Sequence, residues 1–481
     1  MTRLHLFLLG CVCLLLVVGC GGKGEPVTAV TPMPSTPATE TAVPPTPTQP
    51  LATDTPVGME TAVLPTNTAT VSPTTATSTA LSAGVLTETP TNTPVPLPPS
   101  PGEIVFLWSP EPKYDYGPLP QNLYFAKPGD VAGEWEMEAA LTELHGAGLY
   151  LSPDSTKFAI RLFEDTNGDG IVSTRAENSN AYLYPLADKT LTRLTATEIR
   201  GAVRVGWLPD NKQFTYSLQK DIYLYNLEDS TSRQILSFPG LIYLHQWSPD
   251  GRWLAIVSSI SDEPAPGGES HRLDLYNRET NTLISLVDKM GFSGVDWSPD
   301  SQWLVFNYDS NHGLFVTSVN ELTPIELVSS GLSFASWSPD SQWLAFTTDI
   351  GAGNLNLWNP NTRSTETLFG GNGRMTQPIW SPHNNRLAIA LNGEEESSLI
   401  VADAVLKTTS TILVGPKPGP PGPFRRPLKT LHWSPDGQWI MFEASGEDNQ
   451  NLSMIDYSTG DLFTVLDFTE MTTPDNVYWL P

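Results

Sequence analysis

The sequence predicts an all-β protein in which eight four-stranded sheets stand in a ring, the architecture of a β-propeller. Three observations lead to this prediction. A motif of a dozen residues, represented by ASWSPDSQWLAF from Ala335 to Phe346, recurs along the chain from residue 102 onward. Its tryptophan returns at intervals of 40 to 56 residues, a spacing typical of propeller blades. Each repeat also reads as four short strands separated by turns.

The first twenty residues are expected to form a targeting segment that is not part of the fold. Arg3 precedes an apolar run ending at Val18, and this run is too short to predict a membrane span clearly. Gly19 and Cys20 follow it. This order resembles a bacterial lipoprotein signal, and the resemblance implies a signal peptide over residues 1–20 and lipidation of Cys20. An uncleaved anchor helix and a plain secretory signal are the alternatives.

Residues 21–101 are predicted to be a disordered tether. They consist almost entirely of Thr, Pro, Ala, Ser and Val, as in PTNTATVSPTTATSTA. Such a segment buries too little apolar surface to offset the entropy that ordering would cost, and its prolines favour extended conformations. The expected role is a spacer between a membrane and a folded domain at residues 102–481.

Charge and cysteine content limit the function of that domain. The chain has 52 acidic and 26 basic side chains, a net charge of −26. Nucleic-acid binding requires clustered Lys and Arg to neutralise phosphates, so no nucleic-acid partner is expected. The three cysteines, Cys11, Cys13 and Cys20, all lie in the leader. The folded domain is therefore expected to have neither disulfides nor a cysteine-ligated metal.

Each repeat predicts the same series of strands. A first strand ends in Trp, and the Ser-Pro-Asp that follows favours a tight turn. A second strand alternates polar and apolar residues, as in QWLAF, and a third and a fourth strand complete the unit. The tryptophan, or the residue in its place, is found at Leu151, Trp207, Trp247, Trp297, Trp337, Trp380, Trp433 and Trp479.

The two ends of the domain are expected to share one blade. Residues 103–108, 122–129 and 135–142 read as the second, third and fourth strands of a blade that lacks its first, and residues 476–481 read as a first strand alone. Their pairing would close the ring and remove open sheet edges. Together with the units that begin at Leu151 and at the six following tryptophans up to Trp433, this predicts eight blades. Seven blades are the alternative if one irregular unit forms no separate sheet.

The WSPDG-type repeats from residue 102 to residue 481 resemble the TolB-type propeller repeat, a WD-like repeat of bacterial envelope proteins. The resemblance implies a propeller fold and an extracytoplasmic setting. The repeated residues form turns and packing contacts, so the resemblance implies no functional site. A predicted tether stands where TolB has an N-terminal domain, and TolB's partners are therefore not carried over.

A calcium loop is the most specific local motif. Asp165, Asn167 and Asp169 alternate before a glycine, a pattern that resembles the Ca²⁺-binding loop, with the Ile171 carbonyl as a further ligand. Glu177 lies one position beyond the usual closing acid. We expect a structural Ca²⁺ site here; a polar hairpin insertion is the alternative. Calcium titration of an Asp165→Ala/Asp169→Ala variant and its parent tests the site, and equal negligible heats would rule it out.

No catalytic motif is found in the sequence. It lacks HExxH, G-x-S-x-G and P-loop patterns, and we therefore expect no enzyme. Residues that shortly precede the repeat tryptophan should lie near one mouth of the central channel, where propellers often bind ligands. These candidate ligand-binding residues are Arg204, Tyr243, Gln377, Lys429 and Asn476.

The expected function is a lipid-anchored, extracytoplasmic propeller, at the cell surface or in the periplasm, that binds or scaffolds an unidentified protein or glycan partner. The alternative is a glycan-active hydrolase or lyase that uses acidic residues at the channel mouth.

Overall fold

A computed structural model describes most of the chain from residue 102 onward. The described residues are 102–109, 120–129, 135–166, 168, 172, 177–196, 203–260, 271–290, 294–307, 313–329, 331, 333–348, 352–393, 396–415, 428–445, 450–468 and 474–481. The predicted signal peptide at 1–20, Cys20 and the tether at 21–101 lie outside them. Over the described ranges, no helix has the length and apolar character needed to cross a membrane.

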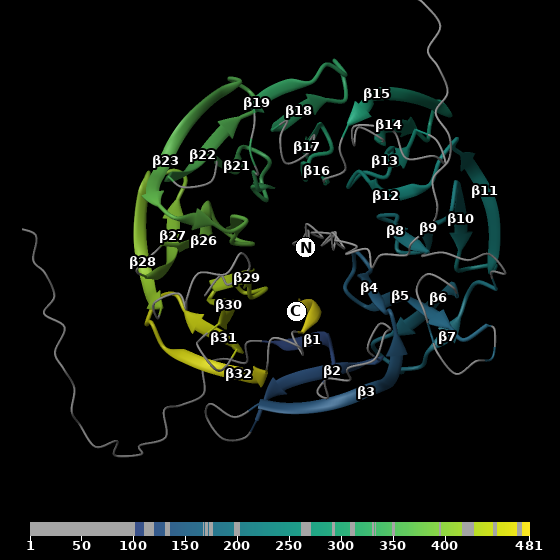
Figure 1. Cartoon of the computed structure of the whole chain (residues 1–481), viewed down its shortest axis with the longest axis horizontal. Helices are drawn as coiled ribbons and strands as arrows, with labels where there is room; N and C mark the ends of the chain where they lie inside the picture. Colours follow the sequence, from purple (N-terminus) through teal and green to yellow (C-terminus); the bar gives the residue numbers. More distant parts are fainter. Residues whose placement is uncertain are drawn as a thin grey trace, which may run out of the picture. The chain divides into compact units, whose positions relative to one another are not determined.

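The strands of the described residues form eight antiparallel sheets arranged as the blades of a ring (Figure 1). From the inside of the ring outward, blade 1 contains β33 (Asp475–Leu480), β1 (Glu103–Trp108), β2 (Pro120–Pro128) and β3 (Trp135–His145); blade 2 contains β4 (Gly148–Leu151), β5 (Lys157–Glu164), β6 (Asn178–Pro185) and β7 (Thr192–Arg193); blade 3 contains β8 (Arg204–Trp207), β9 (Gln213–Leu218), β10 (Asp221–Asn226) and β11 (Thr231–Ser237); blade 4 contains β12 (Ile242–Trp247), β13 (Trp253–Ser259), β14 (His271–Asn277) and β15 (Thr282–Met290).

The other four blades follow the same order. Blade 5 contains β16 (Val295–Trp297), β17 (Trp303–Asn307), β18 (Leu314–Ser318) and β19 (Ile325–Val328); blade 6 contains β20 (Ala335–Trp337), β21 (Leu344–Thr348), β22 (Ala352–Asn359) and β23 (Ser364–Asn372); blade 7 contains β24 (Arg374–Met375) and β25 (Ile379–Trp380), which both pair with β26 (Arg386–Asn392), then β27 (Ser397–Asp403) and β28 (Thr408–Gly415); blade 8 contains β29 (Leu428–Trp433), β30 (Trp439–Ser445), β31 (Gln450–Asp456) and β32 (Leu462–Phe468).

The structure confirms the prediction of an all-β propeller with eight blades, and the alternative of seven is wrong. Each predicted unit forms its own sheet. The closing blade is also confirmed, because β33 pairs antiparallel with β1, with Glu103 opposite Leu480 and Ile104 opposite Trp479. The C-terminal strand thus becomes the innermost strand of the blade that the N-terminal part of the domain begins.

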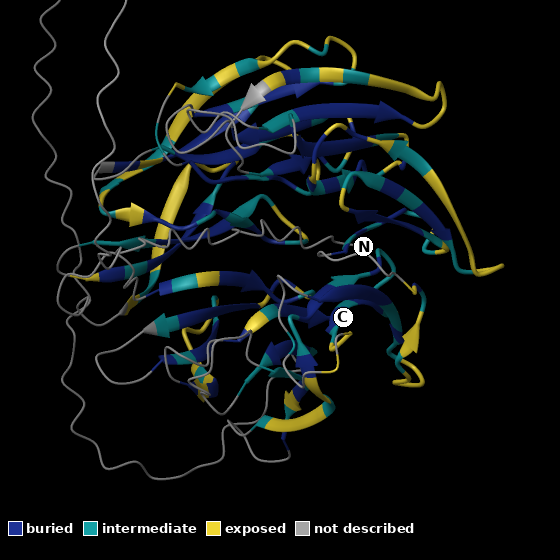
Figure 2. Ribbon diagram, turned by 45° about the vertical axis from the view of Figure 1, so that its right-hand side comes forward, coloured by how far each residue is buried: buried dark blue, intermediate teal, exposed yellow. Residues whose placement is uncertain are grey.

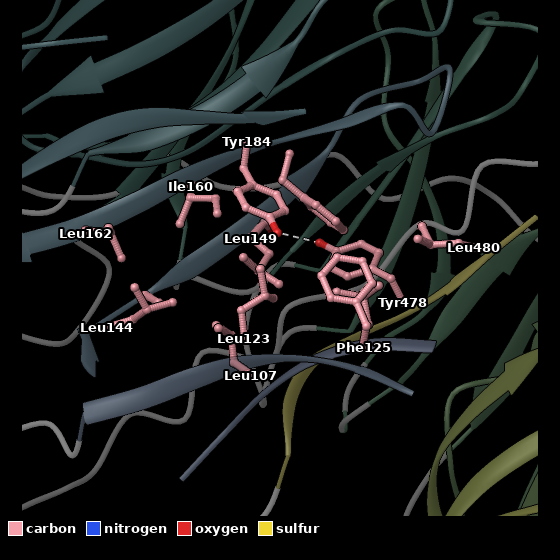
Figure 3. Close-up of a cluster of buried hydrophobic side chains, with 13 residues drawn as sticks. Leu107, Leu123, Phe125, Leu144, Leu149, Ile160, Leu162, Tyr184, Tyr478 and Leu480 are labelled. Atoms are coloured by element: carbon pink, nitrogen blue, oxygen red, sulfur yellow. Dashed lines mark hydrogen bonds between the residues drawn. The ribbon is translucent and has the colours of Figure 1, made fainter. Parts of the chain in front are cut away.

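The hydrophobic core lies between blades. Each of the eight buried clusters joins side chains of two neighbouring blades. Figure 3 shows the cluster between blades 1 and 2. In this cluster the rings of Phe158 and Tyr478 make an edge-to-face contact with centroids 5.3 Å apart. The outermost strands, such as β3 and β11, are largely exposed (Figure 2). One small sheet cannot bury both of its faces, and the ring lets each blade cover the next.

The repeat tryptophans also hydrogen-bond between blades. Their indole N–H groups donate to the carbonyl of the residue that precedes the corresponding tryptophan, or Leu151, of the previous blade. The pairs are Trp207 to Tyr150 at 2.8 Å, Trp297 to Gln246 at 3.1 Å, Trp380 to Ser336 at 2.9 Å and Trp433 to Ile379 at 2.9 Å. Trp247 reaches the equivalent carbonyl through a relay, donating to the Thr215 hydroxyl at 3.0 Å, which donates to the carbonyl of Gly206 at 3.2 Å.

Trp337 and Leu151 depart from this series. The indole N–H of Trp337 is buried without a hydrogen-bond partner. The Leu151 side chain has no N–H to donate. Between blades 1 and 2 the hydrogen bond runs in the opposite direction: the Tyr478 hydroxyl of blade 1 donates to the Leu149 carbonyl of blade 2 at 2.7 Å (Figure 3).

The Ser-Pro-Asp turns hold the opposite ends of the first strands. In blade 5 the Ser298 hydroxyl donates to Asp300 at 2.6 Å and accepts the Trp303 amide at 2.9 Å. The residue after the aspartate has a positive φ, 64° at Ser301 and 72° at Gly251, which explains the preference for Gly there. Where it is Ser, the side chain binds the preceding blade, as in the Asp250 amide donating to the Ser301 hydroxyl at 2.9 Å.

A matched pair of substitutions tests the contribution of the indole hydrogen bonds. Trp297→Phe and Trp337→Phe remove similar packing from two buried sites, but only the first breaks a hydrogen bond and leaves the Gln246 carbonyl without its donor. We expect Trp297→Phe to lower the free energy of unfolding by about 1–3 kcal/mol more than Trp337→Phe, measured by urea denaturation. Equal losses in the two variants would contradict this role.

Candidate functional site

The long connections of the propeller gather at one end of the ring. In an antiparallel blade the first strand begins where the second strand ends. At that end, thirteen residues join β5 to β6 and eleven join β13 to β14, whereas five residues join β4 to β5 at the other end. We call the first of these the loop end. Because function on rigid scaffolds is concentrated in such connections, the loop end is the candidate functional face.

The structure places the five predicted mouth residues at the loop end, on five different blades. Arg204 begins β8, Tyr243, Lys429 and Asn476 are the second residues of β12, β29 and β33, and Gln377 lies two residues before β25. They come together here because first strands run side by side around the inside of the ring (Figure 1).

Three of these residues lie at β-bulges, which sequence reasoning missed. The register of the first strand shifts at Tyr243 in β12, between Lys429 and His432 in β29, and around Asn476 in β33. Thr430 and Asn476 have φ values of 50° and 51°, and a β-branched residue such as threonine is rarely found in this region. Bulges turn side chains away from the regular alternation and are frequent next to binding sites.

Two of the predicted residues form hydrogen bonds between neighbouring blades. The Gln377 side-chain amide donates to the Ala335 carbonyl at 3.3 Å, and the Asn476 carbonyl oxygen accepts the Leu149 amide at 3.3 Å. Their polar groups are therefore engaged within the ring. Arg204, Tyr243 and Lys429 provide the charged and aromatic groups among the five.

Arg204 and Arg161 form a pair of cations at the loop end of blades 2 and 3. Arg161, from β5, donates to the carbonyls of Gly146 at 3.1 Å and Ala147 at 3.4 Å. Burial lowers the pKa of Arg204, and the positive charge of Arg161 lowers it further, while Tyr150 and Tyr243 act in the opposite direction. The sequence pattern identified Arg204 but not Arg161.

A second polar group lies between blades 8 and 1. Lys429 is 3.2 Å from the buried carboxylate of Glu443, which stands opposite it in β30. Gln450 lies on the same face of blade 8, and Trp108 packs against this face from β1. The Gln450 side-chain oxygen and the Trp108 indole N–H are buried without hydrogen-bond partners. One sequence feature could have indicated this group: Glu443 is a charged residue within the largely apolar second strand WIMFEAS.

Three ionisable residues of the first strands are buried, and burial shifts the pKa of each in the direction that favours its neutral form. Burial lowers the pKa of both His245 and His432 to about 4. Burial also raises the pKa of Asp296 to about 7, against hydrogen bonds from the Gln246 side chain and the Trp297 backbone. These residues lie in three different blades, and over the described part of the chain they belong to no group of three His, Cys, Asp or Glu side chains that could hold a metal.

The predicted calcium loop is described only in part. Asn167, Asp169 and Ile171 lie outside the described residues. Asp165 accepts the Gly168 amide at 2.7 Å, and the buried Glu177 carboxylate accepts the Thr166 amide at 2.8 Å. Within the described part of the chain, no three His, Cys, Asp or Glu side chains form a metal-ligating group. Calcium binding therefore stays a prediction.

These features define an eight-bladed β-propeller with its candidate site at the loop end. No protein-family model matches the chain. Similar solved structures include dipeptidyl peptidase 4 of Porphyromonas gingivalis, 13% identical with a TM-score of 0.50 over 79% of this chain and 63% of that one. Others are an oligogalacturonate lyase in complex with manganese (12%, TM-score 0.44, 76% and 98%) and TolB of Acinetobacter baumannii (14%, 0.33, 70% and 82%). At such identities the likeness shows the fold alone.

The buried carboxyl of Asp296 predicts a pH dependence of stability. Between pH 4 and pH 7 the folded protein retains a proton that the unfolded chain has lost, so this group lowers stability as the pH rises through that window. The loss is at most about 4 kcal/mol. Asp296→Asn cannot ionise, and we expect its unfolding free energy to exceed the parent's at pH 8 and to approach it at pH 4. Urea denaturation measures both, and a parallel pH dependence of the two proteins would contradict the assignment.

Proposed function

We propose that this protein is a lipid-anchored, extracytoplasmic propeller that binds or scaffolds a protein or ligand partner at the cell envelope, without catalysis. The observation that carries the proposal is the loop end itself. A closed ring presents side chains from five blades at one end, and three of them lie on bulged first strands. A rigid scaffold with adjustable connections is suited to recognition.

The proposed location rests on the N-terminal sequence. A basic and then apolar leader ends at Gly19 and Cys20, and a Thr- and Pro-rich segment separates it from residue 102. Acyl chains on Cys20 would hold the protein at a membrane, since each buried methylene contributes about 0.8 kcal/mol. The extended tether would then carry the TolB-like propeller away from the bilayer, where a loop end free of the membrane can meet its partner.

The chemistry of the described loop-end residues supports binding over glycan hydrolysis or elimination. Such an enzyme needs acidic groups free to transfer protons. Here Glu443 is paired with Lys429, and Asp475 accepts a hydrogen bond from Gln121 at 3.0 Å. The five mouth residues themselves carry arginine, tyrosine, lysine and amide groups and no carboxylate. This mixed character is what a protein- or ligand-binding face requires.

A capture experiment tests the proposal. The soluble domain, residues 102–481, is immobilised and exposed to envelope extract, and the same protein is applied to a glycan array. We expect specific retention of a protein or glycan that is lost when the loop-end residue Tyr243 is replaced by Ala, and retained when the outer-strand residue Leu283 is replaced by Ala. Turnover of an arrayed sugar would overturn the non-enzymatic role, and absence of any retained partner would overturn binding by this domain.

A further inference from the structure

The half-buried arginines among the described residues fall into two groups. Arg272 donates two hydrogen bonds to Asp274, at 2.7 and 2.5 Å, and Arg386 lies 3.7 Å from Asp403. Among the described residues, neither Arg161 nor Arg204 has a carboxylate partner, although the chain contains twice as many acidic as basic side chains. The described part of the loop end therefore places two neighbouring cations together without an acid between them.

The backbone leaves room for the guanidinium group of Arg161. Gly148 of β4 stands opposite Arg161 in β5. A Cβ atom at Gly148 would lie 3.2 Å from Nη2 of Arg161, tighter than ordinary contact. The guanidinium group thus lies against the first strand of blade 2, with its bonds to the Gly146 and Ala147 carbonyls fixing it at the loop end.

Arg204 lies on the next blade, in a strand that contacts β4, β5 and β12. It interacts electrostatically with Tyr150, Arg161 and Tyr243. It begins β8, whose Trp207 is tied to the Tyr150 carbonyl of blade 2 at 2.8 Å. Tyr243, on the bulge of β12 in blade 4, packs edge-on against His271 with ring centroids 4.6 Å apart. All four side chains, from Tyr150, Arg161, Arg204 and Tyr243, are partly exposed. Three blades therefore bring two guanidinium groups and two phenols to one part of the loop end.

This arrangement is unfavourable without an anion. Burial removes water from Arg204, and the like charge of Arg161 adds repulsion, as the lowered pKa of Arg204 reflects. A bound carboxylate would reverse both effects, because it accepts two parallel hydrogen bonds from a guanidinium group. Phenol hydroxyls can donate to the same oxygens.

We propose that Arg204, together with Arg161, Tyr150 and Tyr243, binds a carboxylate group at the loop end of blades 2 to 4. The inference deepens the proposed binding function and rests on it. It specifies the chemical class of the ligand: a small molecule or glycan unit that carries a carboxylate.

Thermal unfolding with added ligand tests the site. The probes are sodium glucuronate as a sugar acid, sodium acetate as a simple carboxylate, and glucose as a neutral control, with ionic strength held constant by chloride. Arg204→Gln removes the central cation. Arg233→Gln is the matched control. It removes the same charge as Arg204→Gln, but Arg233 is exposed on the outer strand of the same blade. Arg204→Lys keeps the charge without the two-pronged geometry.

We expect carboxylates, but not glucose, to raise the melting temperature of the parent and of Arg233→Gln. Arg204→Gln should need at least about tenfold more ligand for the same rise, since a hydrogen bond to a charged group contributes about 1.5–3 kcal/mol. Arg204→Lys should fall between them. A larger effect of glucuronate than of acetate identifies a sugar acid, and equal effects identify the carboxylate group alone as the ligand. Without ligand, Arg204→Gln should melt no lower than the parent, because it relieves repulsion.

Equal ligand responses of the parent and Arg204→Gln would overturn the inference, as would a parent that responds to neither carboxylate. The capture experiment separates these failures from failure of the proposed function. A parent that retains an envelope partner yet ignores carboxylates leaves the binding role standing and removes only the carboxylate site.

Discussion

The rest of the structure depends on one contact that recurs between blades: a buried tryptophan at the end of a first strand packs on the neighbouring blade and donates its indole N–H to that blade's backbone. Trp207, Trp297, Trp380 and Trp433 make this bond directly, and Trp247 makes it through the Thr215 hydroxyl. A four-stranded sheet exposes two apolar faces. The indole fixes both the spacing and the register at which the next sheet covers one of them, because a hydrogen bond restricts geometry more than apolar contact does.

The interface between blades 1 and 2 also needs a hydrogen bond that fixes spacing and register, and different residues provide it. Leu151 occupies the tryptophan position there and provides packing without a donor. The Tyr478 hydroxyl donates across the seam instead, and Asn476 accepts the Leu149 amide beside it. Both residues belong to the C-terminal strand. The last strand of the chain therefore both completes the closing blade and joins that blade to its neighbour, which holds the loop end rigid enough to position groups from several blades.

Sequence periodicity could predict the ring because its signals are local. The turn after Trp297, the alternation in β17 and the position of the next tryptophan are each written within one repeat, and the two half-units at the ends follow from the same pattern. The mouth positions could be found for that reason, since Arg204 and Tyr243 precede a tryptophan by three or four residues. The bulges at Tyr243 and Thr430 could not, because they depend on the register of the neighbouring strand. The position of Arg161 beside Arg204 and the burial of Asp296 could not be predicted either, because both depend on which groups the neighbouring blades place beside them.

Native-state hydrogen exchange of the closing strand tests the central claim most directly. If β33 is an integral first strand, the hydrogen-bonded amides of Val477–Leu480 should exchange only through global unfolding, with the same free energy of opening as those of Val295–Trp297 in blade 5. Exchange of these amides through a separate opening of clearly lower free energy would contradict the account, because it would show that β33 is not an integral strand of the closing blade.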